Sequence, residues 1–152
     1  LGVIEASMLF VMFFFAWNYF GYTFEDVRSF TYEITSGTAS EHIMYVYQYA
    51  VTFAFGAVIA CQVGNVLVCR SAYLPLYKSM KKKNNLMIWG IVAEVVLFFV
   101  IAYVPFFQML FGTVALKLHH LALLLVCPVV LILLEECRKW ILNKYSKKVS
   151  TI

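Results

Sequence analysis

The segment that decides the fold is residues 43–69, IMYVYQYAVTFAFGAVIACQVGNVLVC, which contains no Asp, Glu, Lys or Arg. A helix needs about 20 consecutive apolar residues to cross the hydrocarbon core of a bilayer. This segment exceeds that length, and the charged residues nearest to it are Glu41 and Arg70. It therefore predicts a membrane-spanning helix.

Three further apolar segments have the same character, so that the sequence predicts spans at residues 1–22, 43–69, 86–104 and 119–140. In composition, 63% of the residues are hydrophobic and 13% are charged, whereas a soluble domain has about 45–50% apolar and about 25% charged residues. We therefore expect an all-α, polytopic membrane protein with four transmembrane helices in one domain, residues 1–152. Pro128 removes a backbone donor from the last span, which predicts a kink there.

The first span has no basic residue before or within it. A signal peptide opens with a basic region ahead of its apolar core, but residues 1–22 contain neither Lys nor Arg. We therefore expect the chain to be N-terminally truncated, with its first span beginning upstream of Leu1.

Basic residues are concentrated in two of the connecting regions. The region after the second span holds Arg70, Lys78, Lys81, Lys82 and Lys83, and the tail holds Arg138, Lys139, Lys144, Lys147 and Lys148. Short cytoplasmic loops carry an excess of Lys and Arg, so this distribution predicts that both termini are cytoplasmic. The chain is expected to be a multi-pass protein of the plasma or cell membrane. The net charge of +4 follows from that topology. The expected partner of these regions is the lipid bilayer, and no nucleic-acid partner is expected.

One ionisable residue lies in the middle of a predicted span. Glu94 is nine residues from Asn85, which is about 13 Å along a helix from the end of the span. Ionisable residues are costly in a membrane, so they usually face the interior of the bundle and mark an ion path or a proton relay. The alternative is a protonated carboxyl that joins two helices as a structural hydrogen bond.

The second span carries polar side chains near one helical face, namely Gln48, Thr52, Gln62, Asn65 and Cys69. Gln62 and Glu94 reach a similar depth on antiparallel helices, and their oxygen atoms are ligands that hard cations prefer. We therefore predict a candidate cation (metal) site formed by Gln62, Asn65 and Glu94. Hydrogen bonding between helices is an equally good interpretation of Gln62 and Asn65.

Other polar groups have simpler interpretations. Glu5 is a further candidate, but its depth in the first span is undetermined. His42, His119 and His120 lie at the outer ends of spans and are interpreted as interfacial residues. The cysteines, Cys61, Cys69, Cys127 and Cys137, form no C-x-x-C pair, so we interpret them as small hydrophobic residues.

Several short motifs follow one another along the chain. They are LGVIEA at residues 1–6, QVGNVLVCR at 62–70, NLMIWG at 85–90, YVPFFQ at 103–108, FGT at 111–113 and EECRKW at 135–140. Together they resemble the seventh to tenth membrane helices of P-type cation-transporting ATPases, over nearly the whole chain. Residues 23–41 carry no such motif, as is expected of a variable outer loop.

The resemblance implies roles for three residues at matching positions. Gln62 stands where calcium pumps of this family carry a Glu ligand and sodium pumps carry a Gln. Asn65 stands where sodium pumps carry an Asp ligand, and Glu94 where they carry a Glu that lines their third sodium site. The resemblance therefore implies a sodium- or calcium-pump-like cation site in which one acid is replaced by an amide.

The catalytic motifs of that family, D-K-T-G and T-G-E-S, do not occur in this sequence, nor does the fourth-helix motif P-E-G-L. Phosphoryl transfer needs positioned carboxylates, Mg²⁺ and a nucleotide site, so we expect no catalytic residue, no cofactor and no ATP hydrolysis in this chain alone. The resemblance implies a support bundle whose partners are the remaining helices and cytoplasmic domains of the parent ATPase, which bind ATP and Mg²⁺. The alternatives are a free-standing four-helix accessory subunit, a small transporter, or a redox enzyme with paired Cys or His residues.

Overall fold

The computed structural model describes residues 2–70, 76–79 and 84–149. Its helices are α1 (Gly2–Tyr19), α2 (Phe24–Ser36), α3 (Glu41–Val68), α4 (Leu76–Ser79), α5 (Asn85–Tyr103), α6 (Pro105–Phe111), α7 (Leu118–Leu124) and α8 (Val126–Val149). Four segments are long and apolar enough to cross a membrane, namely α1, α3, α5 and the segment Leu118–Lys144, which combines α7 with most of α8. The prediction of an all-α protein with four membrane spans is therefore confirmed.

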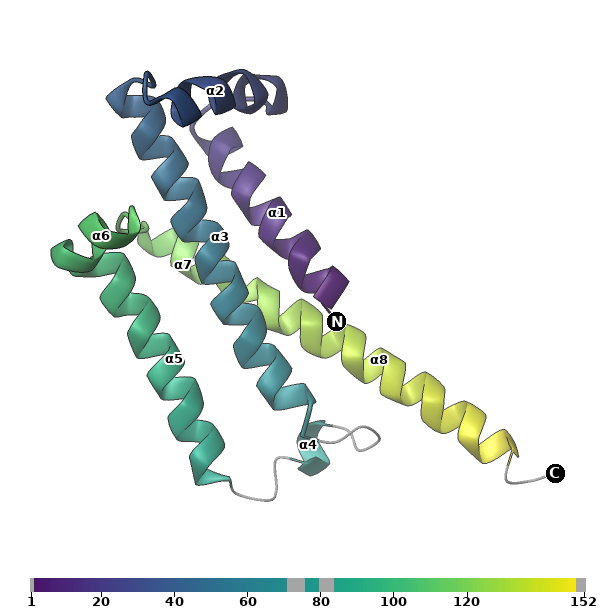
Figure 1. Cartoon of the computed structure of the whole chain (residues 1–152). Helices are drawn as coiled ribbons and strands as arrows, with labels where there is room; N and C mark the ends of the chain where they lie inside the picture. The colour runs from purple at the N-terminus through teal and green to yellow at the C-terminus, as the bar shows by residue number, and fades with distance from the viewer. Residues whose placement is uncertain (1, 71–75, 80–83, 150–152) are drawn as a thin grey trace.

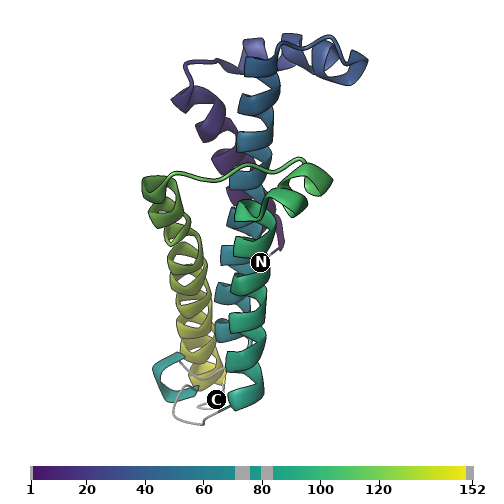
Figure 2. The same ribbon diagram turned by 90° about the vertical axis from the view of Figure 1, so that its left-hand side faces the viewer.

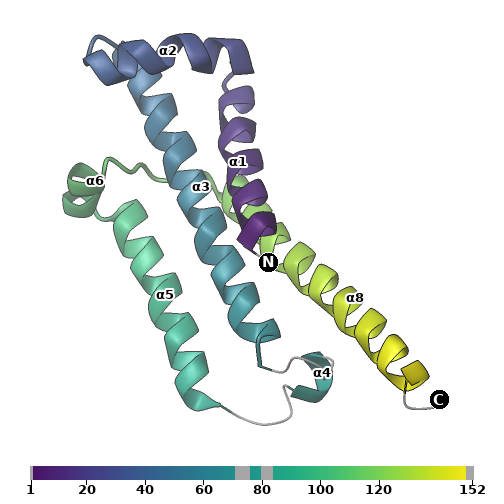
Figure 3. The same cartoon turned by 45° about the vertical axis from the view of Figure 1, so that its right-hand side comes forward.

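The helix α3 is the centre of the bundle. It lies between α1 and α5, and α8 crosses it at an angle (Figures 1 and 3). Eleven of the 28 residues of α3 are buried, compared with two of the 19 residues of α5. The packing of α3 therefore determines where polar side chains of the neighbouring helices can meet.

The helix α2 lies across one end of the bundle, over the ends of α1 and α3 (Figure 1). A variable outer loop was predicted for residues 23–41, because the Thr, Ser and Glu residues of this region obscure its amphipathic pattern. Val27, Phe30 and Ile34 of α2 pack against the core, and the Phe30 ring stacks on Trp17. The Asp26 carboxylate accepts hydrogen bonds from the backbone and the hydroxyl of Thr23, which caps α2 and lowers the pKa of Asp26.

The last span is broken at Leu125, between α7 and α8. Pro128 has no N–H group to donate to the carbonyl of Leu124, four residues earlier, so the regular helical ladder is interrupted at this point. An interruption of the helix near Pro128 is therefore observed, while Leu125 keeps helical backbone angles. The segment around Pro128 approaches α3 closely, since a Cβ atom added at Gly64 would lie 3.0 Å from the Cα atom of Pro128.

The connection between α6 and α7 crosses in front of α3 (Figure 2), and hydroxyl groups of α3 hold it there. The Thr52 hydroxyl accepts a hydrogen bond from the Val114 amide at 3.0 Å, and the Tyr49 hydroxyl accepts one from the Lys117 amide at 3.1 Å. Backbone groups of a connection inside a membrane protein need such partners, because lipid supplies none.

His120 lies near the first residue of α7, at the end of the last span, and its burial was not predicted from the sequence. His120 is 2% exposed, and its Nδ1 atom lies 2.5 Å from the Tyr49 hydroxyl. The connection held on α3 turns this face of α7 inward, where Tyr49 satisfies the imidazole. His42 and His119, in contrast, are exposed.

The orientation of the bundle stays a prediction. Arg70 and Lys78 lie near the end of the bundle opposite α2, which we call the basic end. Lys81, Lys82 and Lys83, which contribute most to the charge argument, lie outside the described residues.

We predict that Gly64→Ala destabilises the bundle by about 1–3 kcal/mol, because the added methyl group has to displace the backbone of Pro128. The matched control is Gly90→Ala in α5, where a Cβ atom meets nothing within 4 Å. Thermal unfolding of the two purified variants in the same detergent measures the difference. Equal unfolding temperatures for Gly64→Ala and the unsubstituted protein would contradict the close packing of α3 on α8.

Candidate functional site

The polar residues of α3 fall into two groups along the helix. Near the α2 end, the buried Thr52 is used within the fold, since it donates to the carbonyl of Gln48 at 2.7 Å and accepts from Val114. Toward the basic end, Gln62 and Asn65 are half-buried. The candidate site is therefore confined to the second group and its neighbours.

Asn65 faces α1. Its Nδ2 atom donates a hydrogen bond to Oε1 of Glu5. Its Oδ1 atom is buried and has no hydrogen-bond partner in the described part of the chain. The sequence predicts Glu94 as the acid beside α3, and the structure gives Asn65 a different carboxylate partner, from the first span.

The face of α3 that packs against α5 is apolar. Gly56, Ile59, Ala60 and Val63 line a groove with Val95, Phe98 and Phe99 of α5. Asn65 is nine residues from Gly56, so it lies about 180° around the helix from this contact. Asn65 therefore points away from α5.

Glu94 is half-buried on α5, one helical turn from Phe98, and so lies near the side of α5 that faces α3. No hydrogen bond joins Gln62, Asn65 and Glu94 to one another in the described residues. The structure thus brings Asn65 together with Glu5 and leaves Gln62 and Glu94 without a direct polar contact inside this part of the chain.

Sulfur atoms lie one helical turn from the Glu5–Asn65 contact. The Cys61 thiol donates to Sδ of Met8 at 3.6 Å, and Cys61 also contacts Cys127 of α8. Cys61 and Cys127 are each 1% exposed, which agrees with their interpretation as small buried residues. In the described residues, no group of three or more His, Cys, Asp or Glu side chains is placed to hold a metal ion.

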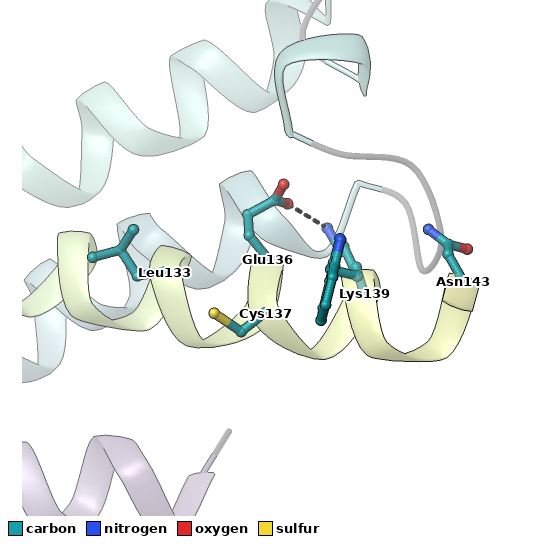
Figure 4. Close-up of a pocket in the computed structure, with 6 residues that line it drawn as sticks. Leu133, Glu136, Cys137, Lys139 and Asn143 are labelled. Atoms are coloured by element: carbon teal, nitrogen blue, oxygen red, sulfur yellow. Dashed lines mark hydrogen bonds and ion pairs between the residues drawn. The ribbon is translucent and has the colours of Figure 1, made fainter. Parts of the chain in front are cut away.

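A second polar cluster, at the basic end of α8, was not identified from the sequence. Lys139 is 2% exposed, and its ammonium donates to the carbonyl of Val68, the last residue of α3, at 2.9 Å. Glu136 lies 3.4 Å from the same ammonium (Figure 4) and accepts from the Leu76 amide of α4 at 3.1 Å. Lys139 therefore caps the negative end of the α3 dipole, where carbonyl groups lack helical partners.

Neighbouring side chains complete this end of the bundle. Glu135 is buried and is paired with Arg138, whose Nε atom donates to it at 2.8 Å. A cavity of about 400 Å³ lies beside the cluster, lined by Leu133, Glu136, Cys137, Lys139, Trp140 and Asn143 (Figure 4). The spacing Glu135-Glu136-x-Arg138-Lys139 indicates such a cluster only if the basic tail is recognised as helical and packed on α3.

The chain has four apolar spans, half-buried amides and carboxylates inside them, and a pair of charged residues that caps α3 at one end. These features define a polytopic membrane protein with polar side chains in its transmembrane core. Residues 1–141 match the family model described as cation transporting ATPase, C-terminus. The chain belongs to this family and is the membrane part of a larger cation-transporting ATPase. No curated protein matches the sequence.

This membership favours the ATPase interpretation over an accessory subunit, a small transporter or a redox enzyme. The matched region, residues 1–141, includes the spans that carry Glu5, Gln62, Asn65 and Glu94. The membership also means that the other helices and domains of the ATPase are partners of this bundle.

We predict that Lys139→Met lowers the free energy of unfolding by about 1.5–3 kcal/mol, the usual contribution of a hydrogen bond to a charged group. The substitution keeps the length of the side chain and removes the donor to the Val68 carbonyl. Lys144→Met, at an exposed position of the same helix, is the control and should change the stability little. If both variants unfold like the unsubstituted protein, Lys139 does not cap α3.

Proposed function

We propose that this bundle contributes side chains to the cation-binding site of its ATPase, in a sodium- or calcium-pump-like arrangement, and performs no catalysis itself. The observation that carries the proposal is Asn65, whose amide oxygen is buried in a membrane span without a hydrogen-bond partner in the described residues. Such an acceptor costs about 1–3 kcal/mol when left unpaired. Its position in a cation-transporting ATPase makes the transported ion a suitable partner.

We also propose Gln62 and Glu94 as ligands along the cation pathway, with Glu94 on the α5 side of α3 and Asn65 on the opposite side. Both carry oxygen atoms in membrane spans and are half-buried, and Glu94 adds a negative charge. Hard cations select carboxylate and amide oxygens. Because neither side chain has a polar partner inside the described part of this chain, both are available to groups on the remaining helices of the ATPase.

We assign phosphoryl transfer and cation binding to different parts of the ATPase. Phosphoryl transfer requires the nucleotide, Mg²⁺ and positioned carboxylates, and we assign these to the cytoplasmic domains of the ATPase. The bundle described here supports the transport site from one side. The basic end, with its cap on α3, is proposed to face the cytoplasm.

We predict that Glu94→Gln and Gln62→Leu in the intact ATPase each raise the cation concentration for half-maximal ATP hydrolysis by about tenfold, which corresponds to about 1.4 kcal/mol per lost ligand. Na⁺ and Ca²⁺ are titrated separately, and vanadate-sensitive hydrolysis is measured. Gln48→Leu, a half-buried amide near the α2 end, is the matched control. Unchanged cation dependence in both test variants would show that Gln62 and Glu94 serve packing alone.

A further inference from the structure

Sulfur atoms from three membrane spans meet where α1, α3 and α8 pack together. The Cys61 thiol of α3 donates to Sδ of Met8 on α1 at 3.6 Å, and it also contacts the Cys127 thiol of α8. We call Met8, Cys61 and Cys127 the sulfur cluster. Both thiols are buried and Met8 is half-buried, so the cluster belongs to the interior of the bundle.

Packed helical backbones hold the sulfur cluster in place. Pro128, which follows Cys127, packs against Gly64, and Gly64 is nearly one helical turn from Cys61. On α1, Met12 lies one turn from Met8 on the same face and is buried. Sites built on helices are positioned more precisely than sites on loops, so the sulfur atoms stay together without a rearrangement of the fold.

A cavity of about 380 Å³ between α1 and α8 leads to the cluster. Met8 and Cys127 line it, together with Met12, Ser7 and aliphatic side chains of the two helices. The Ser7 hydroxyl donates to the Val3 carbonyl at 2.8 Å, and the lining includes no carboxylate or amide side chain. An ion that enters this cavity therefore meets mainly sulfur ligands.

Sulfur donors select a different class of metal ion from oxygen donors. Thiolate and thioether ligands favour soft ions such as Cu(I), whereas carboxylate and carbonyl oxygens suit hard cations. The sulfur cluster supplies two cysteines as anionic ligands, and its third donor is the thioether of Met8. A thioether is neutral and polarisable, so it adds a soft ligand without adding charge to a membrane span.

We propose that Met8, Cys61 and Cys127 form a binding site for one Cu(I) ion between α1, α3 and α8. The cysteines bind as thiolates, the form of Cys that ligates metals, and Met8 binds through its sulfur lone pair. One Cu(I) ion and two thiols give one dithiolate complex and two protons, which are released to the solvent, and no electron is transferred. The site is separate from the oxygen ligands proposed for the transported cation and does not depend on them.

The test measures Cu(I) binding to the intact ATPase by competition with the chelator bathocuproine disulfonate, under anaerobic conditions with ascorbate. Loss of an outer-shell partner of a metal ligand costs about 10–100-fold in affinity. We therefore expect loss of a thiolate ligand, in Cys61→Ala or Cys127→Ala, to weaken one Cu(I) site by at least about 100-fold. Cys69→Ser replaces an exposed thiol and should leave this affinity unchanged.

A second substitution keeps both thiols. Met8→Leu retains an apolar side chain of similar size in α1 and removes the thioether, and we expect it to weaken Cu(I) binding by about tenfold. Met109→Leu, at an exposed position of α6, is the matched control. The thermal unfolding midpoint of each variant without Cu(I) shows whether the variant is folded, and Met8→Leu decides the question if the cysteine variants are not.

Three outcomes would overturn the proposal. The first is an unchanged Cu(I) affinity in Met8→Leu and in the folded cysteine variants. The second is displacement of the bound ion by excess Na⁺ or Ca²⁺, which would indicate oxygen ligands. The third is a loss of free thiols that dithiothreitol reverses and the chelator does not, because Cys61 and Cys127 would then form a disulfide instead of a metal site.

Discussion

The contact between Gly64 of α3 and Pro128 of α8 is the constraint on which the rest of the bundle depends. Association of helices in a membrane relies on close packing, because lipid is as apolar as the helices themselves, and small residues permit that approach. At Gly64 the backbone of Pro128 occupies the space of a Cβ atom. The segment that follows the break at Leu125 crosses α3 at this point.

The rotation of α3 about its axis follows from this contact. With Gly64 turned to α8 and Gly56 turned to Leu124 and Phe98, Asn65 is directed to α1, where Glu5 accepts from it. The same crossing carries Leu131, Glu135 and Lys139 inward at intervals of four residues along α8, and Lys139 reaches the end of α3. The contact between Gly64 and Pro128 thus positions both the candidate cation site and the cap on α3 at the basic end.

Much of the architecture was predictable from the sequence, since each span is a long apolar segment and the interruption near Pro128 follows from the chemistry of proline. The helix α2 was missed because its polar residues outnumber the apolar ones that contact the core. The burial of His120 was not predicted, because its position at the end of a span does not reveal that Tyr49 supplies a hydrogen bond. Lys139 was counted only as a charge in the tail, although its side chain is buried.

The residue types of the candidate site were predictable from the sequence, but which carboxylate contacts Asn65 was not. The composition of the spans identifies Gln62, Asn65 and Glu94 as polar residues in lipid, and a depth argument pairs Glu94 with α3. The depth of a residue along its span does not determine how the helix is rotated about its own axis. The rotation of α3 directs Asn65 to Glu5 instead of Glu94. Gln62 and Glu94 remain predicted ligands whose partners lie on other helices of the ATPase.

Cysteine cross-linking in native membranes tests this rotation of α3 most directly. In a chain with Cys61 and Cys127 replaced by Ala and Cys69 and Cys137 replaced by Ser, the pair Glu5→Cys with Asn65→Cys is compared with the pair Glu94→Cys with Asn65→Cys after mild oxidation. We predict an intramolecular disulfide in the first pair and none in the second, because Asn65 contacts Glu5 of α1 and points away from α5, and a disulfide forms only when the two Cα atoms come within about 7 Å. A disulfide in the second pair and none in the first would contradict the account.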